Sequence, residues 1–168
     1  MPSKLFHPAV WFPRLAGVVA AGLFVAAAPA AAQAPPSPVV KIGHIRIAEP
    51  QRIAISLLER PAADNGVGGA RLAIEDNNTT GQFTGQKFEL AEATITDSSQ
   101  GVEALNRFAA EGIRFIVADL PAELLLAVAD AAAPQNVLVL NAGATDDALR
   151  MQACRANVVH VAPSRAML

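Results

Sequence analysis

Residues 136–140 read Asn-Val-Leu-Val-Leu, and the apolar run in this stretch decides the fold class. Four successive apolar residues are typical of a central parallel strand buried on both faces, because a strand with one solvated face alternates instead. The segment before the run begins at Pro121, which suits the first turn of a helix. The predicted helix continues through Leu124 to Ala133, and Pro134 ends it. A helix that leads into a buried strand is the repeating unit of a parallel α/β sheet.

The same alternation extends along the chain on both sides of this run. Further strands are predicted at residues 39–46, 87–95, 113–117 and 157–161. Helices are predicted from Asp64 or Asn65 to about Asn77, from the cap cluster 97–99 to Gly112, and over 146–151. A turn is predicted at 78–85. A long loop is predicted at 48–63, and it holds a short helix at 55–58. The order strand, helix, strand predicts parallel strands joined by right-handed crossovers, which is a doubly wound α/β lobe.

In a doubly wound sheet, ligands bind beyond the carboxyl ends of the strands, at the point where the strand order reverses. Three predicted loops border that position, namely 47–64, 119–123 and 141–146. We therefore expect the binding residues of this chain to lie on these loops.

The first residues predict a secretory signal peptide. Lys4 and Arg14 precede 14 uncharged residues, 15–28, which match the core of a signal peptide and fall short of the roughly 20 residues that a membrane-spanning helix needs. Small residues follow and place the cleavage after Ala32. A cut after Ala34 and an uncleaved membrane anchor are the alternatives.

The predicted organisation is a signal peptide at 1–32, a Pro-rich leader at 33–38 and a lobe at 39–168. The expected location is the periplasm, without insertion into the membrane after cleavage. No Cys lies near the cut, so a lipid anchor is not expected. Residues 163–168 read as a cap residue and the start of a helix. We therefore expect the chain to be a fragment, an N-terminal lobe truncated before a second lobe.

Composition excludes several classes of function. Residues 33–168 carry 11 Lys and Arg against 15 Asp and Glu, and no basic stretch accompanies stacking aromatic residues. A nucleic-acid partner is therefore not expected. Cys154 is unpaired in this sequence; its thiol is expected to be buried and inert, or to have a partner outside the sequence.

No catalytic or metal motif is present either. The sequence holds no Gly-x-Gly-x-x-Gly, no Gly-x-Ser-x-Gly and no His, Cys, Asp or Glu group with metal-site spacing. His44 and His160 lie on predicted strands, where a lone His is more often packed or hydrogen-bonded than a ligand. We predict a protein that is not an enzyme and has no cofactor. An exported hydrolase whose catalytic group lies in a missing half is an alternative.

Four stretches, in this order and spacing, resemble the branched-chain amino acid type of periplasmic solute-binding protein. They are residues 69–77, 85–90, 111–117 and 137–145. The last reads Val-Leu-Val-Leu-Asn-Ala-Gly-Ala-Thr, where the family usually has an apolar strand followed by Ser-x-Gly-Ala-Thr or similar. The likeness covers most of residues 40–165. It implies the type I periplasmic-binding fold, with two lobes that close on a small-molecule ligand, and a role as the substrate-binding component that serves the membrane permease of an ABC transporter.

The resemblance also implies ligand-binding residues. Asn141, Gly143 and Thr145 occupy the segment after the fourth strand, which in the family offers backbone N–H groups and a Thr hydroxyl to the charged ends of the ligand. A plain strand-to-helix turn is the alternative. Ala122 and Glu123 stand where the family commonly has Ser or Thr residues that hold a carboxylate, and Glu123 would repel an anion unless water screened it. We therefore expect a neutral or weakly polar solute instead of leucine, isoleucine or valine.

Three further stretches, 63–66, 117–122 and 154–157, resemble one branch of this family, which accompanies pyrroloquinoline-quinone-dependent alcohol oxidation systems. This narrower resemblance suggests a link between the chain and the oxidation of alcohols. It leaves a second function open, because a structural or sensory accessory of a periplasmic dehydrogenase, without a transport role, would carry the same stretches.

Overall fold

The computed structural model describes residues 38–48 and 64–168. The predicted signal peptide, the leader before Pro38 and the predicted helix at 55–58 lie outside these residues. None of the described helices is both long and apolar enough to cross a membrane.

Five parallel strands form one sheet in the order β2-β1-β3-β4-β5. The strands are β1 (Val39–Ile47), β2 (Lys87–Ile95), β3 (Phe115–Asp119), β4 (Leu138–Asn141) and β5 (Val158–His160). The helices are α1 (Gly68–Thr84), α2 (Ser98–Ala110) and α3 (Ala122–Ala132), with 3-10 turns η2 (Ala133–Gln135), η3 (Asp147–Arg150) and η4 (Arg165–Met167). The predicted doubly wound α/β sheet is confirmed, and its order reverses between β1 and β3.

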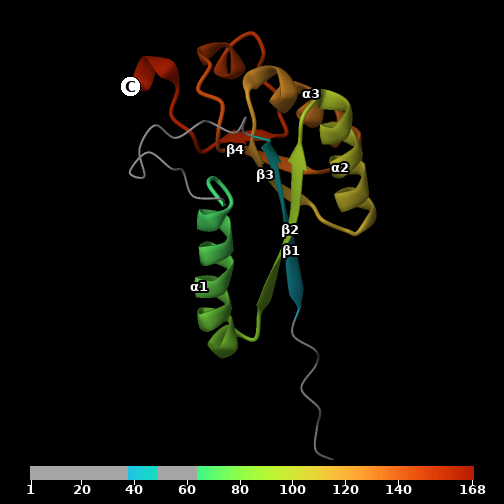
Figure 1. Ribbon diagram of the computed structural model, residues 1–168, viewed down its shortest axis with the longest axis vertical. Helices are drawn as coiled ribbons and strands as arrows, with labels where there is room; N and C mark the ends of the chain where they lie inside the picture. The colour runs from blue at the N-terminus through green and yellow to red at the C-terminus, as the bar shows by residue number, and fades with distance from the viewer. Residues whose placement is uncertain (1–37, 49–63) are drawn as a thin grey trace, which may run out of the picture. The chain divides into compact units, whose positions relative to one another are not determined.

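The helices lie in two layers, with α1 on one side of the sheet and α2 and α3 packed together on the other (Figure 1). The buried core lies under α2 and α3. Leu105 of α2 and Val128 of α3 are fully buried there, together with Ile116 and Val139 of the sheet. Each such side chain contributes about 1.5–3 kcal/mol by leaving water, so this layer supplies most of the apolar stabilisation in the described lobe.

The predicted helix after the cap cluster is confirmed in detail. Asp97 is the N-cap of α2, and its carboxylate accepts a hydrogen bond of 3.0 Å from the Gln100 backbone N–H. Just beyond the helix, Gly112 has a φ of 82°, which a residue with a side chain rarely adopts. The sequence signals at both ends therefore act as predicted.

The prediction for α1 is wrong at both ends, because the helix runs from Gly68 to Thr84 and not from Asp64 to Asn77. Asp64 precedes the helix and caps it only through its backbone carbonyl, which accepts from the Gly68 N–H at 2.8 Å. The predicted turn at 78–85 is helical up to Gly85, which has a φ of 67°. Polar side chains in this region do not end the helix.

Two asparagines show why the helix continues. Asn77 donates to the carbonyl of Ala73 one turn earlier, at 2.7 Å. Asn78 forms two bonds to β2, accepting from the Phe88 N–H at 2.7 Å and donating to the Phe88 carbonyl at 2.9 Å. The Asn78 amide is therefore used between α1 and β2, whereas the Asn77 amide bonds back to its own helix.

The strand predictions are confirmed with small shifts. β3 and β4 each begin two residues after the predicted start and extend to Asp119 and Asn141. The prediction that the 136–140 run is buried on both faces holds on the α2 side only. On the other face Leu138 and Leu140 are only partly buried, and their neighbours Phe115 and Val159 are each 47% exposed. The described part of α1 packs against β2 and leaves β3 to β5 less covered.

Candidate functional site

The carboxyl ends of β1, β3 and β4, with the segments that follow them, are called the carboxyl edge below. This edge includes the place where the strand order reverses, because β1 pairs with β2 on one side and β3 on the other. In Figure 1 it faces the same way as the beginning of α1. The Ala142 N–H donates to the Ala118 carbonyl at 2.9 Å, so the segments after β3 and β4 leave the sheet side by side.

Asn141 ends β4, and its side chain is fully buried. Its amide oxygen accepts from the Ala144 N–H at 2.9 Å, and its amide nitrogen donates to the Ala144 carbonyl at 2.7 Å and lies 3.0 Å from His160 Nδ1. These three contacts occupy the amide. Asn141 thus shapes the turn that carries Gly143 and Thr145, and its side chain is not free to contact a ligand.

Gly143 lies against the end of β3. A Cβ at this position would be 2.6 Å from Asp119 Oδ1 and 2.9 Å from the Leu120 backbone nitrogen. Gly66, in the turn before α1, makes a similar approach, since its Cβ would be 2.7 Å from Asp119 Oδ2, and its φ is 82°. Both glycines therefore make room for the Asp119 carboxylate.

Thr145 is partly buried, and its backbone carbonyl accepts from the Arg165 N–H at 2.7 Å. Its hydroxyl forms no hydrogen bond within the described part of the chain. Ala122 is the first residue of α3 and is partly buried, whereas Glu123 is exposed in the first turn of that helix. A carboxylate in the first turn of a helix interacts favourably with the helix dipole, which gives Glu123 a structural explanation.

Two charged or titratable residues at this edge, Asp119 and His44, were not predicted as site residues. Asp119 is partly buried and is the Cα partner of Arg46 on β1. His44 is only 2% exposed, and its Nδ1 has no hydrogen-bond partner. Burial lowers the pKa of His44, against the opposing influence of Asp119 and Glu92. The sequence signal that was available is position alone, because Asp119 begins a loop predicted to border the site.

Both strand histidines are packed, as predicted. His160 Nδ1 faces the Asn141 amide nitrogen, which is a donor, so this ring nitrogen acts as the acceptor and the imidazole is neutral. Burial lowers the pKa of His160, and nearby Arg150 lowers it further. The neutral imidazole therefore supports the Asn141 turn.

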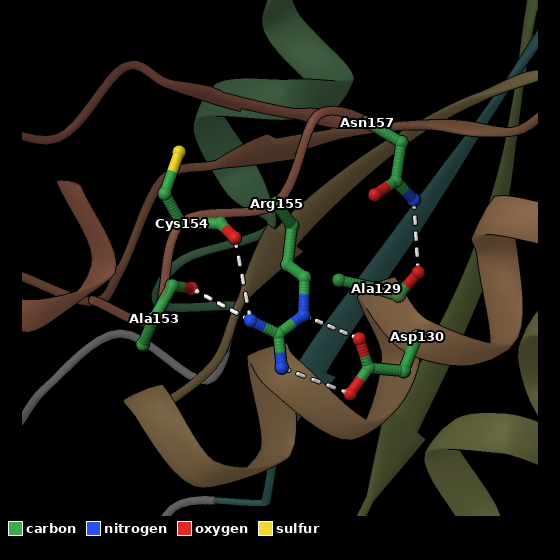
Figure 2. A network of polar contacts seen from close by, with 6 residues as sticks. All are labelled: Ala129, Asp130, Ala153, Cys154, Arg155 and Asn157. Atoms are coloured by element: carbon green, nitrogen blue, oxygen red, sulfur yellow. Dashed lines mark hydrogen bonds and ion pairs between the residues drawn. The ribbon is translucent and has the colours of Figure 1, made fainter. Parts of the chain in front are cut away.

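The segment that leads into β5 is held by a polar network on α3 (Figure 2). Arg155 Nε and Nη2 contact the two oxygens of Asp130 at 2.5 and 3.2 Å, and Nη1 donates to the carbonyls of Ala153 and Cys154. Asn157 Nδ2 donates to the Ala129 carbonyl at 2.8 Å. We call these residues the Arg155 clamp. The stretch 154–157 thus has a structural role in this lobe.

The expectation of a buried thiol is wrong, because Cys154 is exposed. Arg155 points toward Asp130 of α3, and the side chain of the neighbouring Cys154 points away from the clamp (Figure 2).

Two shallow hollows among the described residues lie along β2, away from Gly143. One is lined by residues of β2 and α2, including Thr94, Gln100 and Arg107, and the other by residues near Glu89 and Glu111. Neither contains a predicted site residue. We place the candidate site at the carboxyl edge instead, because topology and the unpaired polar groups coincide there. No cluster of His, Cys, Asp or Glu within residues 38–48 and 64–168 has the arrangement of a metal site.

Comparison with solved structures defines the class of fold. The chain aligns over 76% of its length with an ABC transporter substrate-binding protein from Desulfitobacterium hafniense, with a TM-score of 0.59 and 19% identity, and covers 35% of that chain. A leucine-, isoleucine-, valine-, threonine- and alanine-binding protein from Brucella ovis aligns over the same share, with a TM-score of 0.58 and 20% identity, and is covered to 33%. The fold is therefore that of a type I periplasmic binding protein lobe.

Curated relatives agree with this fold. A stretch of 79 residues is 28% identical to Leu/Ile/Val-binding protein homolog 1 of Brucella abortus and 34% identical to Leu/Ile/Val-binding protein BraC3 of Rhizobium johnstonii. Each match covers 46% of this chain and 21% of the relative. No family model matches the chain. The chain thus matches about a fifth of the length of these relatives, and the similarity supports the resemblance to substrate-binding proteins.

Proposed function

We propose that the chain is the first lobe of a periplasmic protein that binds a small organic solute and delivers it to the membrane permease of an ABC uptake system. The observation that carries this proposal is the sheet order β2-β1-β3-β4-β5, in a fold shared with transporter substrate-binding proteins. That order brings three strand ends to one edge, where the resemblance also locates the ligand.

The ligand that we propose is neutral or weakly polar. A bound carboxylate needs hydroxyl, backbone N–H or Arg donors. The first turn of α3 offers Ala122 and an exposed Glu123, and the Asn141 amide is already used by its own turn. Burial of an unpaired carboxylate beside these groups would cost several kcal/mol. The groups that remain are the backbone of Gly143 and Thr145 and the Thr145 hydroxyl. These groups are uncharged, and they suit a solute that needs no opposite charge from the protein.

Isothermal titration calorimetry tests this proposal. The protein is titrated with leucine, isoleucine and valine, and in parallel with short alcohols, diols and the corresponding aldehydes. We expect saturable binding of at least one neutral solute and none of the three amino acids below about 1 mM, the weak end of the usual affinity scale. Micromolar binding of any of the three would restore the substrate of the related proteins and refute the proposed ligand class.

The cellular location is tested separately. Fusion of the first 38 residues to a reporter that is active only after export should give periplasmic activity. Replacing residues 15–28 by a charged stretch of equal length should abolish it, because a signal peptide needs an apolar core. Activity of the reporter that survives this replacement would contradict a cleaved signal peptide.

The resemblance of stretches 63–66, 117–122 and 154–157 supports a finer proposal, in which the solute derives from pyrroloquinoline-quinone-dependent alcohol oxidation. The same stretches support the second candidate, an accessory of a periplasmic dehydrogenase, and the absence of hydroxyls in the first turn of α3 favours it. Deletion of the gene separates the two. Loss of solute uptake with normal dehydrogenase activity indicates a receptor, and loss of dehydrogenase activity with normal uptake indicates an accessory.

A further inference from the structure

The Asp119 carboxylate is one of the polar groups at the carboxyl edge that have no hydrogen-bond partner among the described residues, and it lies against two other segments of the chain. It is partly buried at the end of β3. Within the described residues it accepts no hydrogen bond and forms no ion pair, although a carboxylate offers about four acceptor positions. The cost of an unpaired carboxylate grows as it is removed from water, so the Asp119 carboxylate, which lies against two other segments of the chain, is a candidate for contact with something outside the chain.

The surroundings make room for this carboxylate without neutralising it. Asp119 Oδ2 lies 2.7 Å from the position that a Cβ on Gly66 would take, and Oδ1 lies 2.6 Å from the position of a Cβ on Gly143. Three separate segments of chain thus meet at Asp119: the turn before α1, the end of β3 and the turn after β4. A side chain at either glycine would fill the space that the carboxylate occupies.

The neighbouring cation does not pair with Asp119. Arg46 is its Cα partner across β1 and β3, but the guanidinium donates instead to the Asn65 carbonyl at 2.8 Å and to Thr94 Oγ1 at 3.3 Å. Arg46 and Asp119 therefore stand side by side as opposite charges without an ion pair within 4.0 Å. The formal charges of this pair cancel, and Glu123 and Asp146 in the segments after β3 and β4 add negative charge to the same edge.

A second polar group lies one step along the same face of β1. His44 is two residues before Arg46, is 2% exposed, and its Nδ1 has no hydrogen-bond partner. Asp119 is the carboxylate with the strongest electrostatic influence on this imidazole. A buried ring nitrogen without a partner is rare in a folded protein and calls for an explanation, which a binding site at this edge would supply.

We propose that Asp119 contacts the ligand in this lobe and accepts a hydrogen bond from a hydroxyl or ammonium group of the solute. This inference rests on the proposed function and names the chemistry of its ligand, a small hydrogen-bond donor. The neutral or weakly polar ligand class proposed above favours a hydroxylated solute over a cation. An ammonium group would satisfy the same carboxylate, so the experiment distinguishes a hydroxyl donor from an ammonium donor.

Nuclear magnetic resonance of side-chain carboxyl carbons tests the contact without a known high-affinity ligand. The protein is labelled at Asp carboxyls, and the Asp119 resonance is assigned with Asp119→Asn. The probes are 1,2-propanediol, ethanolammonium chloride and sodium acetate at matched ionic strength. Asp130 in the Arg155 clamp is the internal control, because Arg155 already contacts both of its oxygens.

We expect 1,2-propanediol to shift the Asp119 resonance saturably and to leave Asp130 in place. A saturable shift with ethanolammonium alone also supports the contact and identifies an ammonium as the donor. An Asp119 resonance that moves no more than that of Asp130 with both donors overturns the inference, as does a shift with acetate alone.

Calorimetry provides the second arm and separates the inference from the proposed function. For any solute that the protein binds, Asp119→Asn should weaken binding about tenfold or more, as expected for a hydrogen bond to a charged group, and Asp130→Asn should not. Equal affinity of Asp119→Asn and the unmodified protein overturns the role of Asp119 while the proposed function stands. Absence of binding to every solute refutes the proposed function, and the resonance of Asp119 still decides the contact.

Discussion

The Arg155 clamp contains an aspartate that is hydrogen-bonded through both oxygens, whereas the carboxyl edge contains one without a partner among the described residues. In the clamp, both oxygens of Asp130 receive hydrogen bonds from Arg155, although the side chain of Asp130 is 56% exposed. At the carboxyl edge, Asp119 is partly buried and has no such partner among the described residues, although Arg46 lies directly across the strand pair. The pairing is thus complete where it fixes the fold and incomplete where we propose that a ligand binds.

The largest expected effect comes from closing the space at Asp119. Gly143→Ala places a Cβ 2.6 Å from the carboxylate and 2.9 Å from a backbone nitrogen, a distance that real contacts do not show. We expect a loss of about 1–3 kcal/mol in the free energy of unfolding, as for other overpacked sites, measured by urea denaturation. Gly69→Ala is the control, because its Cβ would meet nothing within 4 Å and alanine favours the helix. Equal stability of Gly143→Ala and the unmodified protein would show that the contact is not tight.

A moderate effect is expected from pH, because both described histidines are held neutral. Burial is the main cause that lowers the pKa of His44 and of His160 below the usual value of 6.5. The unfolded chain then binds more protons than the folded one as the pH falls through about 6.5, so stability decreases on acidification. The melting temperature should therefore be several degrees lower at pH 5.5 than at pH 7.5.

The variant His44→Leu sharpens this test. The His44 Nδ1 has no partner to lose, and the substitution removes one titrating group from the buried edge. We expect a smaller difference between the two pH values in this variant, measured by circular dichroism. A melting temperature that does not change between pH 7.5 and pH 5.5 in the unmodified protein would contradict the neutral state of both imidazoles.

The smallest effects come from the two aspartates, and they should differ in sign. Asp130→Asn removes an acceptor from Arg155 and should lower the melting temperature slightly, because exposed ion pairs contribute little. Asp119→Asn removes an unpaired carboxylate and should leave stability unchanged or raise it. Thermal melts of both variants at pH 7.5 test the comparison directly, and a larger loss for Asp119→Asn would refute the view that Asp119 is unpaired.

The acid range gives an independent check on the clamp. The hydrogen bond from Arg155 is the main cause that lowers the pKa of Asp130 below its usual value of 3.8. The stabilisation by the clamp is therefore present above pH 3.8 and is lost as the pH falls through the lowered pKa. The difference in melting temperature between the unmodified protein and Asp130→Asn should shrink in this acid range.

The fold could be predicted from sequence because its signals are local. The apolar run at 136–140, the Asp97 cap and Gly112 each act on their own neighbourhood, and the structure contains the corresponding elements. The predicted end of α1 at Asn77 is wrong because Asn77 and Asn78 resemble turn residues in the sequence. Their amides bond to Ala73 and to β2, and only the fold supplies the second of these partners.

The candidate site was predicted in part. The segment from Asn141 to Thr145 lies at the edge that topology predicted, but the Asn141 side chain is used to form the turn. The sequence does not single out Asp119, because the stretch 117–122 that contains it assigns no role to its side chain. Its environment arises when Gly66 and Gly143 come together around it, which no spacing in the sequence reveals.

The two hydrogen bonds between Asn78 and Phe88 have a consequence for the order of folding. They join residues ten positions apart, whereas the bond from Arg46 to Thr94 joins residues 48 positions apart. Closing the longer loop costs about 1.4 kcal/mol more in chain entropy. We therefore expect α1 and the beginning of β2 to form a unit before β2 pairs with β1. Pulse-labelling hydrogen exchange should protect the Phe88 amide before that of Ala48, which donates to Ile95; the reverse order would exclude this sequence of events.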